Sequence, residues 1–200
     1  MATRRERDTE RTREQIMEAA SELFLTDGYE AVSVRKIAEK ANISHGTIYI
    51  HFKDKDDLLY QVSEEQFSRL MSRLRRLPRS REPLRRIEDA LLEIMRFGLD
   101  HPNDFQLMMG LQTTYGGPKS INQWGPNAAQ VGDFLDVLMQ EAAEEGQIQL
   151  GEKELDDLVI LSVIHGVVIT AVTESLERER ADDVALRSVE VMLRGLGAGE

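Results

Sequence analysis

The chain has 200 residues, of which 41% are hydrophobic, with no cysteine and a formal net charge of −11. This hydrophobic content is enough to bury a core, and the lack of cysteine excludes disulfides, thiolate metal sites and thiol nucleophiles. The charged first residues contain no apolar segment, so we expect no signal peptide. The longest apolar run, at 158–172, is shorter than the roughly 20 residues that a membrane span needs. We therefore expect a cytoplasmic protein without membrane contact.

The negative charge is distributed unevenly. Residues 87–200 contain 21 acidic and 7 basic residues, whereas residues 1–60 contain 12 and 10. A nearly neutral N-terminal part can face phosphates if its basic residues lie on one side. The densest basic run, eight arginines at 69–86, is an alternative patch for nucleic acid, but we interpret it as a solvated helix face.

Apolar side chains at intervals of three and four residues predict a first helix over about 12–27. They are Ile16, Ala19, Ala20, Leu23 and Phe24. Thr12 and Gln15 are spaced as a capping box, and Gly28 suits the end of the helix.

Two short helices are predicted next, at about 34–40 and 44–51. Ser33 and Ser44 are typical caps for them, and Asn42 tolerates the positive φ that a tight turn requires. Residues 47–52 alternate with a period of two, as in a strand, but no other segment predicts a strand that would pair with them. The two helices and their turn therefore predict a helix-turn-helix.

Inward and outward sides can be assigned to the second of these helices. We expect Ile48 and Ile50 to pack inward. The polar and planar side chains, Ser44, His45, Thr47, Tyr49 and His51, then lie on or near its exposed sides. Such groups suit phosphates and base edges. Phe52 is interpreted as a core aromatic and Tyr49 as exposed, while His51 is either a phosphate contact or a structural hydrogen-bonding group.

The rest of the chain is also predicted to be helical. The expected helices cover about 54–77, 83–101, 103–113, 128–142, the 158–172 run and 182–194. Asp54 is a predicted cap, Pro83 suits a first helical position, and Gly146 ends a helix. Residues 113–127 form the clear loop of the second half. We predict an all-α fold of about nine helices, with domains at 1–60 and 61–200.

The ordered motifs of residues 12–60 resemble the N-terminal DNA-binding domain of the TetR (tetracycline repressor) family. They include Leu-Phe, Gly-Tyr, Ser-Val, Ile-Ala, Gly-Thr-Ile-Tyr, His-Phe and Lys-x-x-Leu, in the family's order. Two positions depart from the family pattern. His45 stands where lysine is common, which makes the charge there dependent on pH, and Asn42 stands where glycine is usual.

The resemblance implies that the helix at 44–51 enters the major groove of double-stranded DNA. It places His45, Gly46, Thr47 and Tyr49 at the DNA surface, with Ser33 and Arg35 at the start of the preceding helix and Lys55 on a phosphate. Arg4, Arg5 and Arg7 would form a flexible basic arm. The family also pairs this domain with a helical one that binds a small-molecule effector and forms a homodimer through its last two helices.

The 158–172 run is apolar nearly all round, which one packed face does not require. A symmetric partner explains it, and a two-fold dimer predicts a palindromic operator. Side chains suited to an effector pocket are Met95, Phe97, His101, Phe105, Met108, Met109, Tyr115, Trp124 and His165. For each of these residues ordinary core packing is the alternative. No cofactor or metal ligand set is expected.

We therefore expect a sequence-specific transcriptional regulator, a dimeric repressor that a small molecule releases from its operator. An architectural or co-regulatory DNA-binding protein without an effector is the alternative. The chain has no His-Glu-x-x-His, no Gly-x-Ser-x-Gly and no phosphate-binding loop, so we expect no enzyme.

Overall fold

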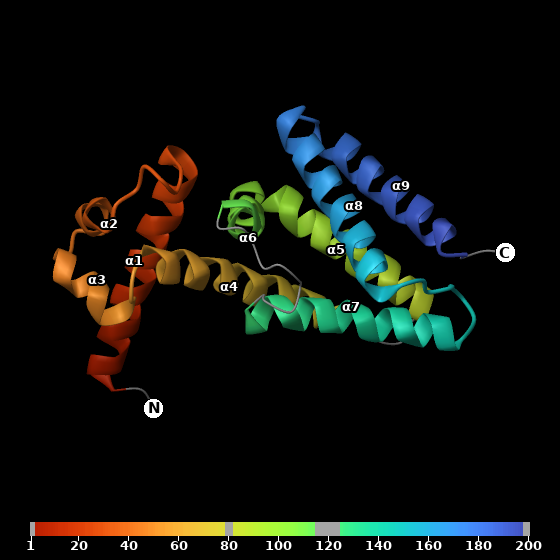
Figure 1. Ribbon diagram of the computed structural model, residues 1–200, viewed down its shortest axis with the longest axis horizontal. Helices are drawn as coiled ribbons and strands as arrows, with labels where there is room; N and C mark the ends of the chain where they lie inside the picture. The colour runs from red at the N-terminus through yellow and green to blue at the C-terminus, as the bar shows by residue number, and fades with distance from the viewer. Residues whose placement is uncertain (1–2, 79–81, 115–124, 198–200) are drawn as a thin grey trace. The chain divides into compact units, whose positions relative to one another are not determined.

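The computed structural model describes residues 3–78, 82–114 and 125–197. Within these ranges the chain forms nine helices and no strand, which confirms the all-α prediction (Figure 1). The chain divides into two compact units. The first contains Met1–Gln66 and Gln106–Gly125, and the second contains Phe67–Phe105 and Pro126–Glu200. The domain boundary expected at residue 60 stays a prediction.

The first unit begins with helix α1 (Arg4–Asp27), which starts earlier than expected. Its capping box is formed by Thr3 and Glu6: the Thr3 hydroxyl accepts from the Glu6 amide at 3.3 Å, and the Thr3 amide donates to the Glu6 carboxylate at 2.7 Å. The expected cap at Thr12 is wrong, because that hydroxyl donates to the Asp8 carbonyl inside the helix. The expected flexible arm is also wrong, since Arg4, Arg5 and Arg7 lie in the first two turns of α1.

Helices α2 (Val34–Lys40), α3 (His45–His51) and α4 (Lys55–Leu74) follow. A cluster of buried apolar side chains joins α1, α2, α3 and the start of α4, and it includes Ile16, Phe24, Ile37, Ile48, Phe52 and Leu58. The capping predicted for α4 is confirmed, because Asp54 accepts from the Asp57 amide at 2.8 Å. Helix α4 contributes residues to both units, up to Gln66 in the first and from Phe67 in the second.

The remaining helices are α5 (Pro83–Asp100), α6 (Pro102–Thr114), α7 (Pro126–Glu144), α8 (Lys153–Thr173) and α9 (Arg178–Gly195). In the second unit α5 is central, because it packs against α7, α8 and α9 (Figure 1). Pro83 occupies the first turn of α5, and Gly146 follows α7 with a φ of 71°, as predicted. Most of the loop predicted at 113–127 lies outside the described residues.

Helix α5 approaches α8 closely at Gly98. A Cβ atom placed there would lie 2.7 Å from Val168 and 2.9 Å from Phe105, closer than side-chain carbons pack. A larger residue at this position would therefore force Val168 or Phe105 to shift.

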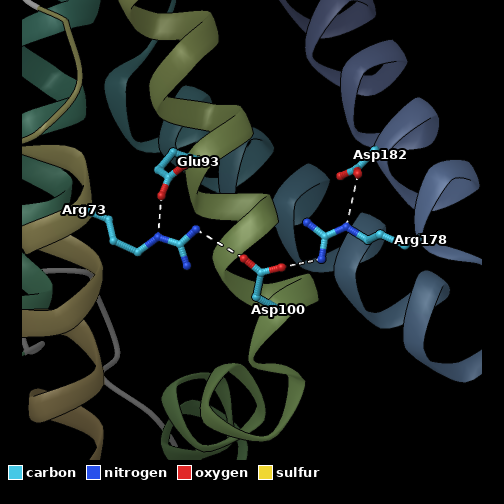
Figure 2. Close-up of polar contacts among 5 residues, drawn as sticks. All are labelled: Arg73, Glu93, Asp100, Arg178 and Asp182. Atoms are coloured by element: carbon cyan, nitrogen blue, oxygen red, sulfur yellow. Dashed lines mark hydrogen bonds and ion pairs between the residues drawn. The ribbon is translucent and has the colours of Figure 1, made fainter.

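A chain of ion pairs connects α4, α5 and α9 in the second unit (Figure 2). Arg73 binds Glu93 and donates to Asp100 at 3.2 Å, and Arg178 binds Asp100 and donates to Asp182 at 3.1 Å. Other arginines of the basic run bind within the same unit: Arg75 to Gln130 and Arg86 to Glu141, at 2.7 and 2.6 Å. These contacts correct the expectation of a merely solvated face, because part of the run holds helices together.

Helix α8 has 21 residues and is long and apolar enough, by length and composition, to cross a membrane. The expectation that this segment is too short for a membrane span, made from residues 158–172 alone, is therefore corrected. A core helix of a folded domain meets the same criteria. One face of α8, which carries Ile160, Ile164 and Val168, is buried in its own unit. Its other face is largely exposed: Leu155 and Val159 are more than half accessible.

Candidate nucleic-acid interface

The turn between α2 and α3 depends on Asn42. Its φ is 55°, in the left-handed region, as its residue type predicts. The Asn42 amide donates to the Glu39 carbonyl at 3.2 Å, and the Ile43 amide donates to the Ala38 carbonyl at 3.0 Å. These two bonds satisfy the last carbonyls of α2 and turn the chain into α3.

Both short helices have the serine caps that the sequence predicts. Ser33 Oγ accepts from the Lys36 amide at 3.3 Å, and Ser44 Oγ accepts from the Thr47 amide at 3.2 Å. The Ser44 and Thr47 hydroxyls also lie 2.7 Å apart, within hydrogen-bonding distance. The cap therefore holds the Thr47 hydroxyl in one position at the start of α3.

The two sides of α3 differ in burial. Ile48 and Phe52 are buried, whereas 51% of the Tyr49 side chain is exposed, as predicted for these three residues. The Tyr49 ring meets the His45 ring edge to face, with centroids 5.1 Å apart. At Gly46 a Cβ atom would meet only the Ser44 hydroxyl, at 3.9 Å, so this backbone is open to a close approach. The exposed side of α3 thus combines an aromatic pair with accessible backbone.

Ile50 lies on the exposed side, and the inward position expected for it is wrong. Its side chain is 78% exposed. The expectation followed the period of two in 47–52, but at about 100° per residue Ile50 points roughly 200° away from Ile48. Once Ile48 and Phe52 are taken as the buried pair, four residues apart, helical spacing places Ile50 outward. An exposed isoleucine beside Tyr49 offers an apolar surface that sequence reasoning missed.

Basic residues of the first unit are partly neutralised by neighbouring acids. Arg35 is exposed and lies 3.0 Å from Glu39 one turn later. Lys36 binds Asp27, and this hydrogen bond, with a weaker one from Thr26, lowers the pKa of the Asp27 carboxyl. Arg4 and Arg5 are exposed in the first turn of α1. His51 is half-buried, with its ring 6.3 Å from Phe52.

Lys55 lies differently from the position that the resemblance implies. Its ammonium donates to the carbonyls of Tyr29 and Val32, at 2.9 and 3.0 Å, and lies 3.8 Å from the centre of the Tyr29 ring. The side chain is half-buried. A phosphate contact by Lys55 stays a prediction, but two of its three donors are already used within the protein.

The residues predicted for an effector pocket fall in both units of the chain. Met95, Phe97 and Phe105 are buried in the second unit, where His101 and His165 are exposed. Ring contacts join Phe97 to His101 and Phe105 to His165. Met108 is buried and Met109 half-buried in the part of α6 that belongs to the first unit. Tyr115 and Trp124 lie outside the described residues.

Known proteins match both the motif and the whole chain. The family model described as "Bacterial regulatory proteins, tetR family" matches residues 16–62. The transcriptional repressor KstR of Rhodococcus jostii is 31% identical over 185 residues, which cover 90% of this chain and 82% of that protein. The fatty acid metabolism regulator protein of Bacillus subtilis is 26% identical over 182 residues, which cover 89% of this chain and 90% of that protein.

A solved structure has the same fold. It is a regulatory protein in the tetR family from Rhodococcus, with a TM-score of 0.72 at 21% identity, and the match covers 94% of this chain and 98% of that one. The helix-turn-helix with its capped α3 and the match to KstR over 90% of this chain indicate the same family. The chain belongs to the TetR family of DNA-binding bacterial transcriptional regulators.

Proposed function

We propose that this regulator is a homodimeric repressor that binds a palindromic operator through α3 and is released from it by a small apolar effector. The DNA-contacting set comprises Arg4, Arg5, Ser33, Arg35, Ser44, His45, Gly46, Thr47, Tyr49 and His51, with Ile50 added because its side chain is exposed. Hydroxyl, imidazole and phenol groups on α3 supply hydrogen bonds to base edges and phosphates, and Ile50 supplies an apolar contact.

The observation that carries the proposal of a dimer is an apolar groove along α8 and α9. Its lining contains the apolar side chains of Val159, Val163, Val184 and Val191. Charges of both signs also line it, Asp156 and Asp183 with Arg180 and Arg187. Lipid tails would offer these charges no polar partner, whereas a second copy related by a two-fold axis can pair acid with base across the apolar strip. This supports the homodimer through the last two helices.

Two valines provide a matched test of the dimer. Val191 lies in the groove and is 54% exposed, while Val137 on α7 is 55% exposed and lies outside it. Val191→Glu should give a monomer in analytical ultracentrifugation at micromolar concentration, because the interface would bury an unpaired carboxylate. Val137→Glu should stay a dimer. A wild-type monomer, or equal behaviour of the two variants, would contradict the proposal.

The effector is proposed to be apolar because of what the second unit can offer it. In the described part of this unit the residues that are buried as a whole are apolar, so a pocket among them would favour an apolar effector. Met95, Phe97 and Phe105 are the buried members of the predicted pocket set in this unit. The relative from Bacillus subtilis is named as a regulator of fatty acid metabolism, which agrees with such an effector.

The effector is tested with the full-length protein and a duplex selected by it from random DNA. Saturated fatty acids of increasing length, and their coenzyme A thioesters, are added to the complex. Release that strengthens with chain length supports an apolar effector. If neither these compounds nor a metabolite extract releases the DNA, the alternative of a regulator without an effector is favoured. We also propose that the protein catalyses no reaction, in keeping with its regulator relatives.

A further inference from the structure

Lys55 occupies an electrostatically unfavourable position. It is the first residue of α4, where the positive end of the helix dipole repels a cation. Asp56 and Asp57 in the same turn offset that repulsion. The lysine stem carries the ammonium away from the helix end to the segment that connects α1 and α2. Its contacts there give this lysine a structural role that a solvated lysine lacks.

The contacts of Lys55 form a closed set with the connecting segment. The ammonium donates to the carbonyls of Tyr29 and Val32 and lies on the Tyr29 ring. The Tyr29 hydroxyl in turn donates to Asp56, the next residue of α4. The Tyr29 ring also lies 5.3 Å from that of Phe24 in the core cluster. We call these four residues, Tyr29, Val32, Lys55 and Asp56, the Lys55 clamp.

The Lys55 clamp acts on the start of α2. Val32 is buried and directly precedes Ser33, whose side chain caps α2. Holding the Val32 carbonyl therefore fixes where α2 begins. Helix α2 packs on α3 through Ile37, Ala38 and Ile48 of the core cluster, so the two short helices move together. The pair is attached to α4 at both ends, by residues 52–54 after α3 and by the clamp before α2.

A phosphate contact would compete with these bonds. The distance of 3.8 Å from ammonium to ring centre is a cation–π contact, and the partly buried carbonyls lose a hydrogen-bond donor if the ammonium leaves. Lys53, two residues earlier, is exposed at the end of α3 and needs no such exchange. The geometry therefore separates the two lysines into a half-buried structural cation and an exposed one.

We propose that Lys55 is a positioning residue for DNA recognition, which sets α2 and α3 relative to the start of α4, and that Lys53 is the phosphate ligand of this segment. The proposal rests on DNA binding through α3. It assigns to Lys55 an effect on the choice between DNA sequences, and to Lys53 a uniform electrostatic effect. The two effects differ in their dependence on salt.

The test compares Lys55→Met with Lys53→Met in the full-length protein, using the selected duplex and a scrambled duplex across a salt series. Lys53→Met should weaken both duplexes equally and reduce the salt slope by about 0.9. Lys55→Met should weaken the selected duplex about tenfold, leave the scrambled one within about twofold, and keep the slope unchanged. Tyr29→Phe, which removes the hydroxyl that donates to Asp56 and keeps the ring, should shift preference in the same direction but less.

Two further measurements complete the test. The double variant Lys55→Met with Tyr29→Leu should lose no more affinity than the larger single loss, because the residues act together. Without DNA, hydrogen exchange at the start of α2 should accelerate in Lys55→Met and not in Lys53→Met. A reduced slope with equal losses on both duplexes, or unchanged exchange in Lys55→Met, overturns the proposal. Failure of the wild type to bind any duplex would instead refute DNA binding through α3, and the exchange result would still decide the clamp.

Discussion

Arg73 and Arg178, from α4 and α9, share the single carboxylate of Asp100 at the end of α5 (Figure 2). Arg73 donates to one carboxylate oxygen at 3.2 Å, and Arg178 binds the other. Asp100 lies at the C-terminal end of α5, where the helix dipole repels an anion. The two arginines therefore offset an unfavourable position and join three helices of the second unit at one residue.

Asp100→Asn should destabilise the protein by about 1 kcal/mol. Charged hydrogen bonds contribute about 1.5–3 kcal/mol when buried. The side chains of Asp100, Arg73 and Arg178 are 35%, 31% and 45% exposed, so solvent screens them, and the variant also relieves repulsion by the dipole. Denaturation of the full-length protein measures the change. Asp133→Asn, at an exposed aspartate of α7, is the control and should stay within about 0.5 kcal/mol.

The contribution of Asp100 should disappear in acid. Partial burial raises the pKa of its carboxyl, but the hydrogen bonds from Arg178 and Arg73 outweigh this effect, and the pKa is lowered from its ordinary value. The unfolded chain therefore takes up the proton first as the pH falls. Stability from Asp100 is complete above the ordinary pKa, about 4, and is lost as the pH falls through the folded value.

This dependence is measured as the difference in unfolding free energy between the wild type and Asp100→Asn from pH 7 to pH 3. We expect the difference to be constant down to about pH 5 and to shrink below about pH 4. A difference that grows in acid would mean that Asp100 is not held as an anion by the two arginines.

Features that depend on a few neighbouring residues could be predicted from the sequence. Ser33 and Ser44 cap α2 and α3, Asp54 caps α4, and Asn42 has the left-handed φ, because these roles follow from the chemistry of one side chain and its nearest amides. The burial of Ile48 follows from helical spacing. The helix-turn-helix was therefore predictable almost residue by residue. The inward position expected for Ile50 followed a period of two, although helical spacing places this residue outward.

Features that depend on distant contacts could not be predicted from the sequence. The contacts of Lys55 with Tyr29 join residues 26 positions apart, and those of Asp100 with Arg178 join residues 78 apart. No local pattern indicates such a pair, since each residue has many possible partners along the chain.

In the turn between α2 and α3, glycine at residue 42 should preserve the stability of the protein and alanine should lower it. Asn42 has a φ of 55°, where a Cβ atom without a compensating polar group costs about 1 kcal/mol or more. Asn42→Ala should lose about 1 kcal/mol of unfolding free energy, and Asn42→Gly should stay within about 0.5 kcal/mol. Denaturation of both variants measures this. Equal losses would show that the side-chain amide, and not the backbone conformation, matters there.

Ile50 should recognise a thymine methyl group. Its side chain is 78% exposed on α3 beside Tyr49. Apolar surface in water is unfavourable, so covering it with a thymine methyl group would stabilise the complex. Replacing each thymine of the selected duplex by deoxyuridine removes one methyl group at a time. At one position of each half-site the wild type should lose about fourfold in affinity, the equivalent of one buried methyl.

Ile50→Ser should bind the unmodified duplex more weakly and should not respond to deoxyuridine at that position, because the apolar partner is gone. Its unfolding free energy should change by less than about 0.5 kcal/mol, since the side chain contributes little to the core. Val137→Ser, at an exposed valine of α7, is the matched control and should respond to deoxyuridine as the wild type does. If Ile50→Ser and the wild type respond equally at every thymine, Ile50 faces the sugar-phosphate backbone or solvent and reads no base.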